Sequence, residues 1–220
     1  MIVIVGIGVA GQMASAPRNA LESEDGFVDT LESATIAVFF ALLYGVVGIA
    51  GEYRHGTITP TFLATPIRER VLGAKLVVYA GAGLLLGAFA LLLALAMALP
   101  WFAAKNIDYS LADRDVALFV VGLLAAATLW GSLGVAYGSV VPNQVGALVT
   151  ALIWLLIIEN ILAGLVPEVA RFTPGKAAQA LMRVEVEDLL TMWAAALVTV
   201  GYIAAFAAIG ATVTMRRDVT

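Results

Sequence analysis

Long apolar stretches separated by short polar segments make up almost the whole chain. A helix needs about 20 apolar residues to cross a bilayer, and most of these stretches are close to that length. They cover residues 34–51, 76–99, 116–140, 145–165 and 189–213, and a shorter stretch covers 1–13. The pattern predicts an all-α, polytopic membrane helix bundle of about six transmembrane helices. It forms a single transmembrane domain over residues 1–220.

Prolines and polar residues indicate where these spans end. Pro100-Trp101 predicts the end of the third span at an interface, where tryptophan is enriched. Pro142 predicts a tight turn between the fourth and fifth spans, because the residue before a proline is disfavoured in a helix. Residues 30–34 are expected to cap the second span. Residues 1–13 are expected to form the outer half of a first helix whose N-terminal part is missing or short. A signal peptide is the weaker alternative, since no Lys or Arg precedes this stretch.

Two longer polar segments are expected on the outer side. Residues 16–32 are acidic, and residues 167–188 are polar and partly amphipathic. The second segment predicts one or two short helices lying at the outer surface, with a plain loop as the alternative. Partial burial is expected for its apolar residues Val169, Phe172, Ala177, Leu181 and Val184.

Composition narrows the class of protein. Hydrophobic residues make up 62% of the chain and charged residues 13%, whereas soluble domains are about one quarter charged. The chain has no Cys and one His, which excludes disulfides, thiolate metal sites and a multi-His metal site. Its basic residues are few and scattered, so nothing indicates a nucleic-acid partner.

The polar segment between the second and third spans is the densest in charge. It contains Glu52, Tyr53, Arg54, His55, Gly56 and Thr57, then Pro66, Arg68, Arg70 and Lys75. Its basic residues would lie near headgroup level and meet anionic lipids or an acidic cleft. Gly56 is expected to relax the backbone where the span turns along the surface, and Pro66 to end a second short helix.

The order of residues in this segment is a Glu, a Gly-Thr pair, a Pro followed by basic residues, and a Lys entering the next span. It resembles the cytoplasmic loop of the permease subunit of bacterial type-2 ATP-binding-cassette (ABC) transporters. The resemblance covers one contiguous stretch, 52–75. Family members usually begin with a basic amphipathic segment and a full first helix, and this chain departs from that pattern.

The resemblance implies the permease subunit of an ATP-driven exporter in the bacterial cytoplasmic (inner) membrane. The ten polar-segment residues would form the ATPase-coupling loop. Partners would be an ABC ATPase subunit, a second copy or a sister permease, and membrane lipids. The chain contains no Gly-x-x-x-x-Gly-Lys-Ser/Thr sequence, so ATP, the implied cofactor, would bind the separate ATPase chain.

Other functions remain as alternatives. An ATP-independent multi-span transporter or a membrane assembly protein has the same hydropathy, although a secondary transporter usually carries charged residues within several spans and repeat symmetry. A membrane enzyme is the least favoured, because no catalytic motif is recognisable.

Residues within the spans offer one further candidate site. Glu159 and Asn160 lie about two thirds along the fifth span, where a carboxylate should face the bundle or water. Glu159 is either a pathway residue or a structural one, bonded to the start of the following segment or paired with Arg171 or Lys176.

Glycine pairs and tryptophans recur along the apolar stretches. With 21 glycines in the chain, the pairs Gly83/Gly87 and Gly134/Gly138 are expected by chance and receive no packing role. The tryptophans Trp101, Trp130, Trp154 and Trp193 are expected to be interface anchors or lipid-facing.

Topology follows from span parity. The N-terminus, the loop at 52–75, the turn at Pro142 and the C-terminus share one side, which we expect to be the cytoplasm. Basic residues are equally numerous on both sides, but those on the expected cytoplasmic side lie in shorter loops.

Overall fold

The computed structural model describes residues 1–17, 21, 26–55, 68–107, 110–111, 113–141, 143–184 and 189–215. Every regular element in these ranges is helical. Five described helices are long and apolar enough to cross a membrane, and one shorter apolar helix precedes them. The expected class, a helical membrane bundle, is therefore confirmed at this level.

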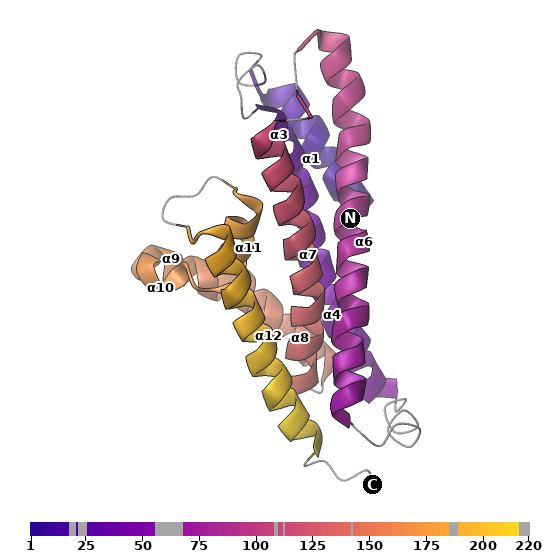
Figure 1. The fold of residues 1–220 in the computed structure, drawn as a ribbon, viewed down its shortest axis with the longest axis vertical. Helices are drawn as coiled ribbons and strands as arrows, with labels where there is room; N and C mark the ends of the chain where they lie inside the picture. Colours follow the sequence, from indigo (N-terminus) through magenta and orange to yellow (C-terminus); the bar gives the residue numbers. More distant parts are fainter. Residues whose placement is uncertain are drawn as a thin grey trace.

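The elements keep the labels of Figure 1. Their bounds are α1 Ile2–Ser15, α3 Gly26–Leu31, η1 Glu32–Thr35, α4 Ile36–His55, α6 Arg68–Lys105, α7 Arg114–Val140, α8 Gln144–Ile153, η2 Trp154–Ile158, α9 Glu159–Leu165, α10 Pro167–Ala170, α11 Pro174–Met182 and α12 Met192–Met215. Here η1 is a 3₁₀ turn and η2 is a π-helical turn.

Helix α7 lies at the centre of the bundle. It packs against α4, α6, α11 and α12, and Figure 1 shows α4, α6 and α7 running side by side along the long axis. Most residues along its inner faces are small or apolar, so it is buried more completely than its neighbours. A helix that contacts neighbouring helices on most sides has no water-facing side, so it needs no polar face.

Glycines let these three helices approach closely. A Cβ placed on Gly83 of α6 would lie less than 3.0 Å from the carbonyl oxygen of Ala127 on α7. A Cβ on Gly134 of α7 would meet the carbonyl oxygen of Leu42 on α4 in the same way. The expectation that these glycines occur by chance was wrong, because each removes a side chain at a backbone-to-backbone contact.

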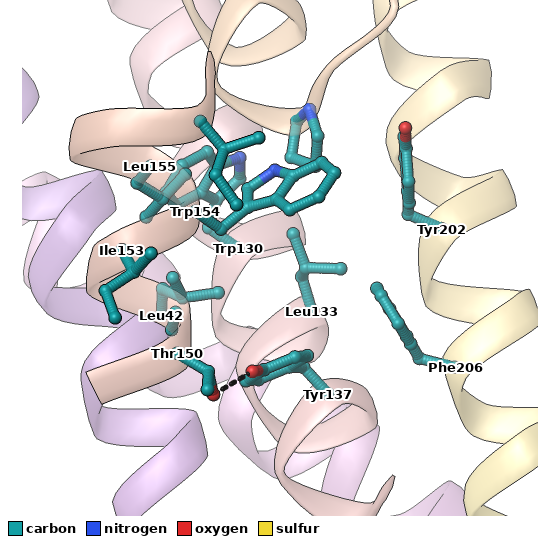
Figure 2. A pocket seen from close by; sticks show the side chains of 13 residues that line it. Leu42, Trp130, Leu133, Tyr137, Thr150, Ile153, Trp154, Leu155, Tyr202 and Phe206 are labelled. Carbon is teal, nitrogen blue, oxygen red and sulfur yellow. Dashed lines mark hydrogen bonds between the residues drawn. The ribbon is translucent and has the colours of Figure 1, made fainter. Parts of the chain in front are cut away.

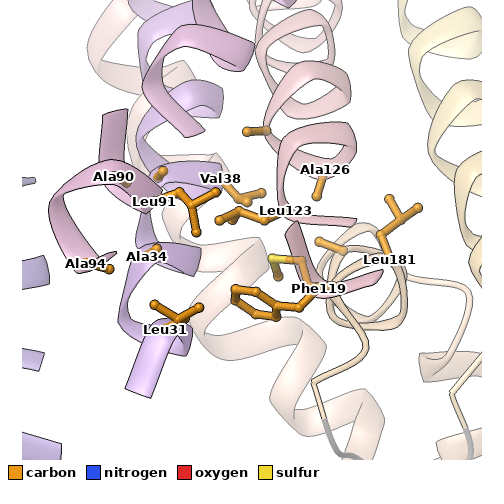
Figure 3. Packing of buried hydrophobic residues seen from close by; sticks show 14 of the residues in the cluster. Leu31, Ala34, Val38, Ala90, Leu91, Ala94, Phe119, Leu123, Ala126 and Leu181 are labelled. Carbon is orange, nitrogen blue, oxygen red and sulfur yellow. The ribbon is translucent and has the colours of Figure 1, made fainter. Parts of the chain in front are cut away.

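The end of the bundle that contains α3 holds a dense apolar core. Leu31, Val38, Leu91, Phe119 and Leu123, drawn in Figure 3, belong to one cluster of buried residues. The chain approaching the second span takes part in it: α3 is a buried turn of helix rather than part of a polar outer segment. The expected cap is also absent, because the 3₁₀ turn η1 leads directly into α4.

Helix α6 is longer than the apolar pattern indicated. It continues through Pro100 to Lys105, although a proline inside a helix removes one backbone hydrogen bond. Phe102 lies in that extra turn and is fully buried, with its ring edge-to-face against Phe27 at 5.3 Å. This tertiary contact offsets the cost of the proline, so the prediction that Pro100-Trp101 ends the helix was wrong.

The segment after the fifth span forms two short helices, α10 and α11, as one of the two expectations had it. Ala177 and Leu181 are buried, but Val169 and Phe172 are largely exposed. Burial in this segment therefore belongs to α11, which packs against α7 and α12. Pro142 lies outside the described residues.

Candidate functional site

The ends of the polar segment are continuations of two long helices. Glu52 lies in the last turn of α4 and Lys75 in the second turn of α6. Their side chains form an ion pair, with 28% and 15% of their surfaces exposed. Backbone atoms of Tyr53, Arg54 and His55 continue α4, Arg68 begins α6, and Gly56, Thr57 and Pro66 lie outside the described residues. The predicted surface helices are therefore not tested.

Close packing supports the ion pair from within the bundle. The hydroxyl of Tyr79 on α6 lies directly against Gly48 on α4, where a Cβ would overlap it. The rings of Tyr44 and Tyr79 lie 5.2 Å apart. Ser132 of α7 donates a hydrogen bond of 3.0 Å to the carbonyl oxygen of Leu76. The start of α6 is thus fixed to both α4 and α7.

Basic residues at the start of α6 do not stabilise that helix. A helix N-terminus carries partial positive charge, so cations in its first turn are unfavourable by about 0.3–1 kcal/mol each. Even so, Arg70 lies in the first turn of α6 and is exposed. Its charge therefore suits an anionic surface outside the bundle, such as lipid headgroups or acidic side chains.

Glu159 lies in a different part of the molecule and is 6% exposed. Its carboxylate accepts hydrogen bonds from Trp154 Nε1 at 3.0 Å and from the backbone N–H of Gly175 at 3.1 Å. Gly175 is in the first turn of α11, whose N-cap residue Thr173 makes no side-chain capping bond. Glu159 therefore supplies a side-chain acceptor for a backbone donor at the start of α11.

The π-helical turn η2 brings the side chains of Trp154 and Glu159 together. In a π-helix, backbone hydrogen bonds join residues five apart, and the N–H of Glu159 bonds to the carbonyl oxygen of Trp154. The side chains of Trp154 and Glu159 are also joined, by the hydrogen bond that the indole Nε1 donates to the carboxyl group. A regular α-helix aligns residues three or four apart instead, so sequence periodicity gives no sign of this pair.

The expected contact of Glu159 with the start of the following segment is present, but its expected ion pair is not. Arg171 lies over the Phe172 ring at 5.0 Å, and Lys176 donates to Gln179 at 3.0 Å. Asn160 donates to the carbonyl oxygen of Leu156, one turn earlier in its own helix, at 2.9 Å. The pairing prediction was wrong because a buried backbone N–H lies closer than either basic group.

Two hollows adjoin this region. The apolar hollow has a volume of about 310 Å³ and lies between α7, α8, η2 and α12, as Figure 2 shows. The polar hollow, of about 280 Å³, is lined by Glu32, Glu159, Asn160, Lys176 and Gln179 among others. Trp130 and Leu155 line both hollows.

Trp130 is the residue that the sequence interpretation misplaced. It was expected at an interface or facing lipid, but its side chain is only 4% exposed. Trp130 lies more than four turns into α7, far from either end of that span. This position indicates that it is not an interface residue. Trp193, by contrast, is 84% exposed, as expected of a lipid-facing residue.

Among the residues that the structure describes, no cluster of three or more His, Cys, Asp or Glu could hold a metal ion. The two candidate regions are not brought together, since Glu52 bonds to α6 and Glu159 bonds to α11. No protein-family model matches the chain, and neither curated proteins nor solved structures give a match.

Proposed function

We propose that this chain is the permease subunit of an ATP-driven exporter, which forms the substrate pathway and couples to a separate ATPase subunit. The observation that carries the proposal is the ion pair between Glu52 and Lys75. It joins the two helices that emerge into the polar segment, so a force applied to that segment reaches both helices together. The resemblance of residues 52–75 to an ATPase-coupling loop supports the same role.

Helix α6 is suited to carry such a movement. At 1.5 Å per residue, its 38 residues extend about 57 Å, well beyond the ~30 Å hydrocarbon core of a bilayer. Its start is fixed to α4 and α7, and its far end packs against α1 and α3. A shift of the polar segment would therefore be transmitted as a rigid-body movement to the opposite end of the bundle.

The proposed assembly contains two permease chains, either identical or sister subunits, and two ATPase chains in a bacterial inner membrane. ATP binds the ATPase chains, and this chain carries out no catalysis. An ATP-independent transporter gains no support from Glu159, because its carboxylate is engaged by Trp154 and Gly175.

Breaking the ion pair tests the coupling role. In the Glu52→Ala variant, Lys75 loses its partner and the two helix ends can move independently. We expect membrane insertion to persist, while stimulation of the co-purified ATPase falls to the level of the ATPase alone. The measurement is ATP hydrolysis by the reconstituted complex with and without the variant chain.

Two matched variants make this result specific. Exchanging the charges, with Glu52→Lys and Lys75→Glu together, should restore part of the coupling. Asp115→Asn removes the exposed pair with Arg183, 2.8 Å long, near the start of α7 and should leave coupling unchanged. Normal stimulation by Glu52→Ala, or failure to co-purify any ATPase from the native host, would refute the proposal.

Sidedness gives an independent test. We expect position 57 to face the cytoplasm and position 168 the outside, because three candidate spans, an odd number, lie between these positions in the chain. The native chain has no Cys, so Thr57→Cys and Glu168→Cys each create a single labelling site. An impermeant thiol reagent added to intact cells should label only position 168, and labelling of position 57 would overturn the topology.

A further inference from the structure

The apolar hollow lies at the middle of three membrane spans. Trp130 of α7, Trp154 of η2 and Tyr202 of α12 all line it. Each of these residues is close to the midpoint of its own candidate span. The hydrocarbon core of a bilayer is about 30 Å thick, so a hollow at mid-span lies deep within it and far from water.

The hollow opens on to the surface of the bundle. It is a partly open recess rather than an enclosed cavity. In Figure 2, α8 and η2 lie on one side of it, α12 lies on the other, and α7 lies between them. Helix α8 packs against α4 and α7, whereas α12 packs against α6, α7 and α11. The two sides are thus held apart by different neighbours, and at this depth the medium outside the opening is lipid hydrocarbon.

The lining of the hollow does not suit water. The hydroxyl groups of Tyr137 and Thr150 bond to each other, and Trp154 Nε1 bonds to Glu159. No charged residue is among the described residues that line it. A buried water needs about two to four polar partners, and the Tyr202 hydroxyl provides one at most. We therefore expect hydrocarbon, rather than water, to fill the hollow.

The size and walls of the hollow suit a single chain. A cavity of about 150 Å³ holds benzene, so 310 Å³ has room for about twice that bulk. On α12, the rings of Tyr202 and Phe206 stack at 6.2 Å, and Phe206 meets Tyr137 edge-to-face at 5.5 Å. These contacts fix the rings in place, so the hollow does not close by rotation of one side chain.

We propose that the apolar hollow binds one acyl chain of a bilayer lipid, which enters sideways between α8 and α12. The chain gains dispersion contacts with the aromatic and aliphatic walls, and an empty hollow would forfeit those contacts. The head group of the same lipid stays at the membrane surface. Binding needs no ATPase, so failure of the permease proposal in the coupling experiment would leave this inference standing.

Fluorescence of Trp130 tests the proposal. Trp101→Phe, Trp154→Phe and Trp193→Phe together leave Trp130 as the sole tryptophan, and its side chain is only 4% exposed. The variant is reconstituted in dioleoyl phosphatidylcholine mixed with phosphatidylcholine that carries bromine on the distal half of one chain. Bromine quenches tryptophan at short range. Because one chain occupies the hollow, quenching of Trp130 should rise in direct proportion to the fraction of brominated lipid.

A chain with Trp193 as its sole tryptophan is the matched control. That side chain is 84% exposed, so several lipids contact it at once, and its quenching should be nearly complete at a lower fraction of brominated lipid. Absence of quenching at Trp130 would overturn the proposal. A Trp130 curve with the same shape as that of Trp193 would also overturn it, because it would show contact with many lipids instead of one.

Filling the hollow tests where the chain binds. In the chain with Trp130 alone, Ala151→Phe adds a ring at the wall of the hollow and should abolish most of the quenching. Leu156→Phe enlarges an exposed side chain on η2 and should leave the quenching unchanged. Unaltered quenching in Ala151→Phe would contradict the location. If Ala151→Phe does not fold, the shapes of the Trp130 and Trp193 curves decide. If the triple variant does not fold, subtracting the fluorescence of Trp130→Phe from that of the native chain gives the Trp130 curve.

Discussion

Replacing Gly83 with alanine is expected to lower the free energy of unfolding by about 1–3 kcal/mol, the usual range for overpacking a core. The new Cβ would lie less than 3.0 Å from the carbonyl oxygen of Ala127. That atom is backbone on a central helix and cannot rotate away. Helices α6 and α7 would have to separate, which would weaken the neighbouring contact of Gly131 with Tyr79 as well.

Gly81→Ala is the matched control for this experiment. Gly81 lies on the same helix, and its Cβ would meet nothing within 4 Å. Because alanine is the better helix former, Gly81→Ala should cause no loss. Both variants can be compared by unfolding in detergent with increasing SDS. Equal stability of Gly83→Ala and Gly81→Ala would show that close backbone contact does not hold these helices together.

Glu159→Leu is expected to have an effect of similar size for a different reason. It removes the acceptor for two donors, Trp154 Nε1 and the N–H of Gly175. A buried donor left without a partner costs about 1–3 kcal/mol, so the total loss should be about 3 kcal/mol. The start of α11 should become less well ordered, because a backbone donor in its first turn loses its side-chain acceptor.

Three further variants separate capping from other roles of Glu159. Glu159→Gln keeps an acceptor oxygen and should lose less stability than Glu159→Leu. Asn160→Ala should have little effect, since that side chain is exposed and bonds within its own helix. Combining Glu159→Leu with Trp154→Phe should cost less than the sum of the two single changes. Additive losses, or equal losses for Asn160→Ala and Glu159→Leu, would contradict the capping role.

The apolar pattern predicted that long apolar helices exist, because the length and hydrophobicity that a bilayer requires are read directly from residue types. The fourth span matched α7 to within two residues at its start, and the fifth ended at Leu165 as expected. Errors arose where contacts between distant residues override local signals. Phe102 extends α6 past Pro100, and Phe27 and Leu31 bury a helix in a segment that its charges marked as polar.

The candidate site was predictable only in part. Glu52 and Lys75 were both singled out by residue type and order, but their pairing depends on how α4 and α6 cross. Glu159 stood out as a carboxylate within a span, whereas its partner Gly175 acts through its backbone and leaves no trace in the sequence. Trp130 was classed with the other tryptophans because enrichment at interfaces is a statistical tendency. Its burial follows from the central position of α7.

The π-helical turn at Trp154–Ile158 also has a consequence for how this chain tolerates changes in length. Such a turn fits one more residue into the helix than regular α-helical spacing would. Deleting one residue there would restore that spacing and leave the helix after it facing nearly the same way, because the turn had accommodated the extra residue. Glu159 would stay directed towards Gly175 while the span remained intact. In a regular α-helix, by contrast, the same deletion would rotate everything after it by about 100°, so this turn makes the span tolerant of a change in length.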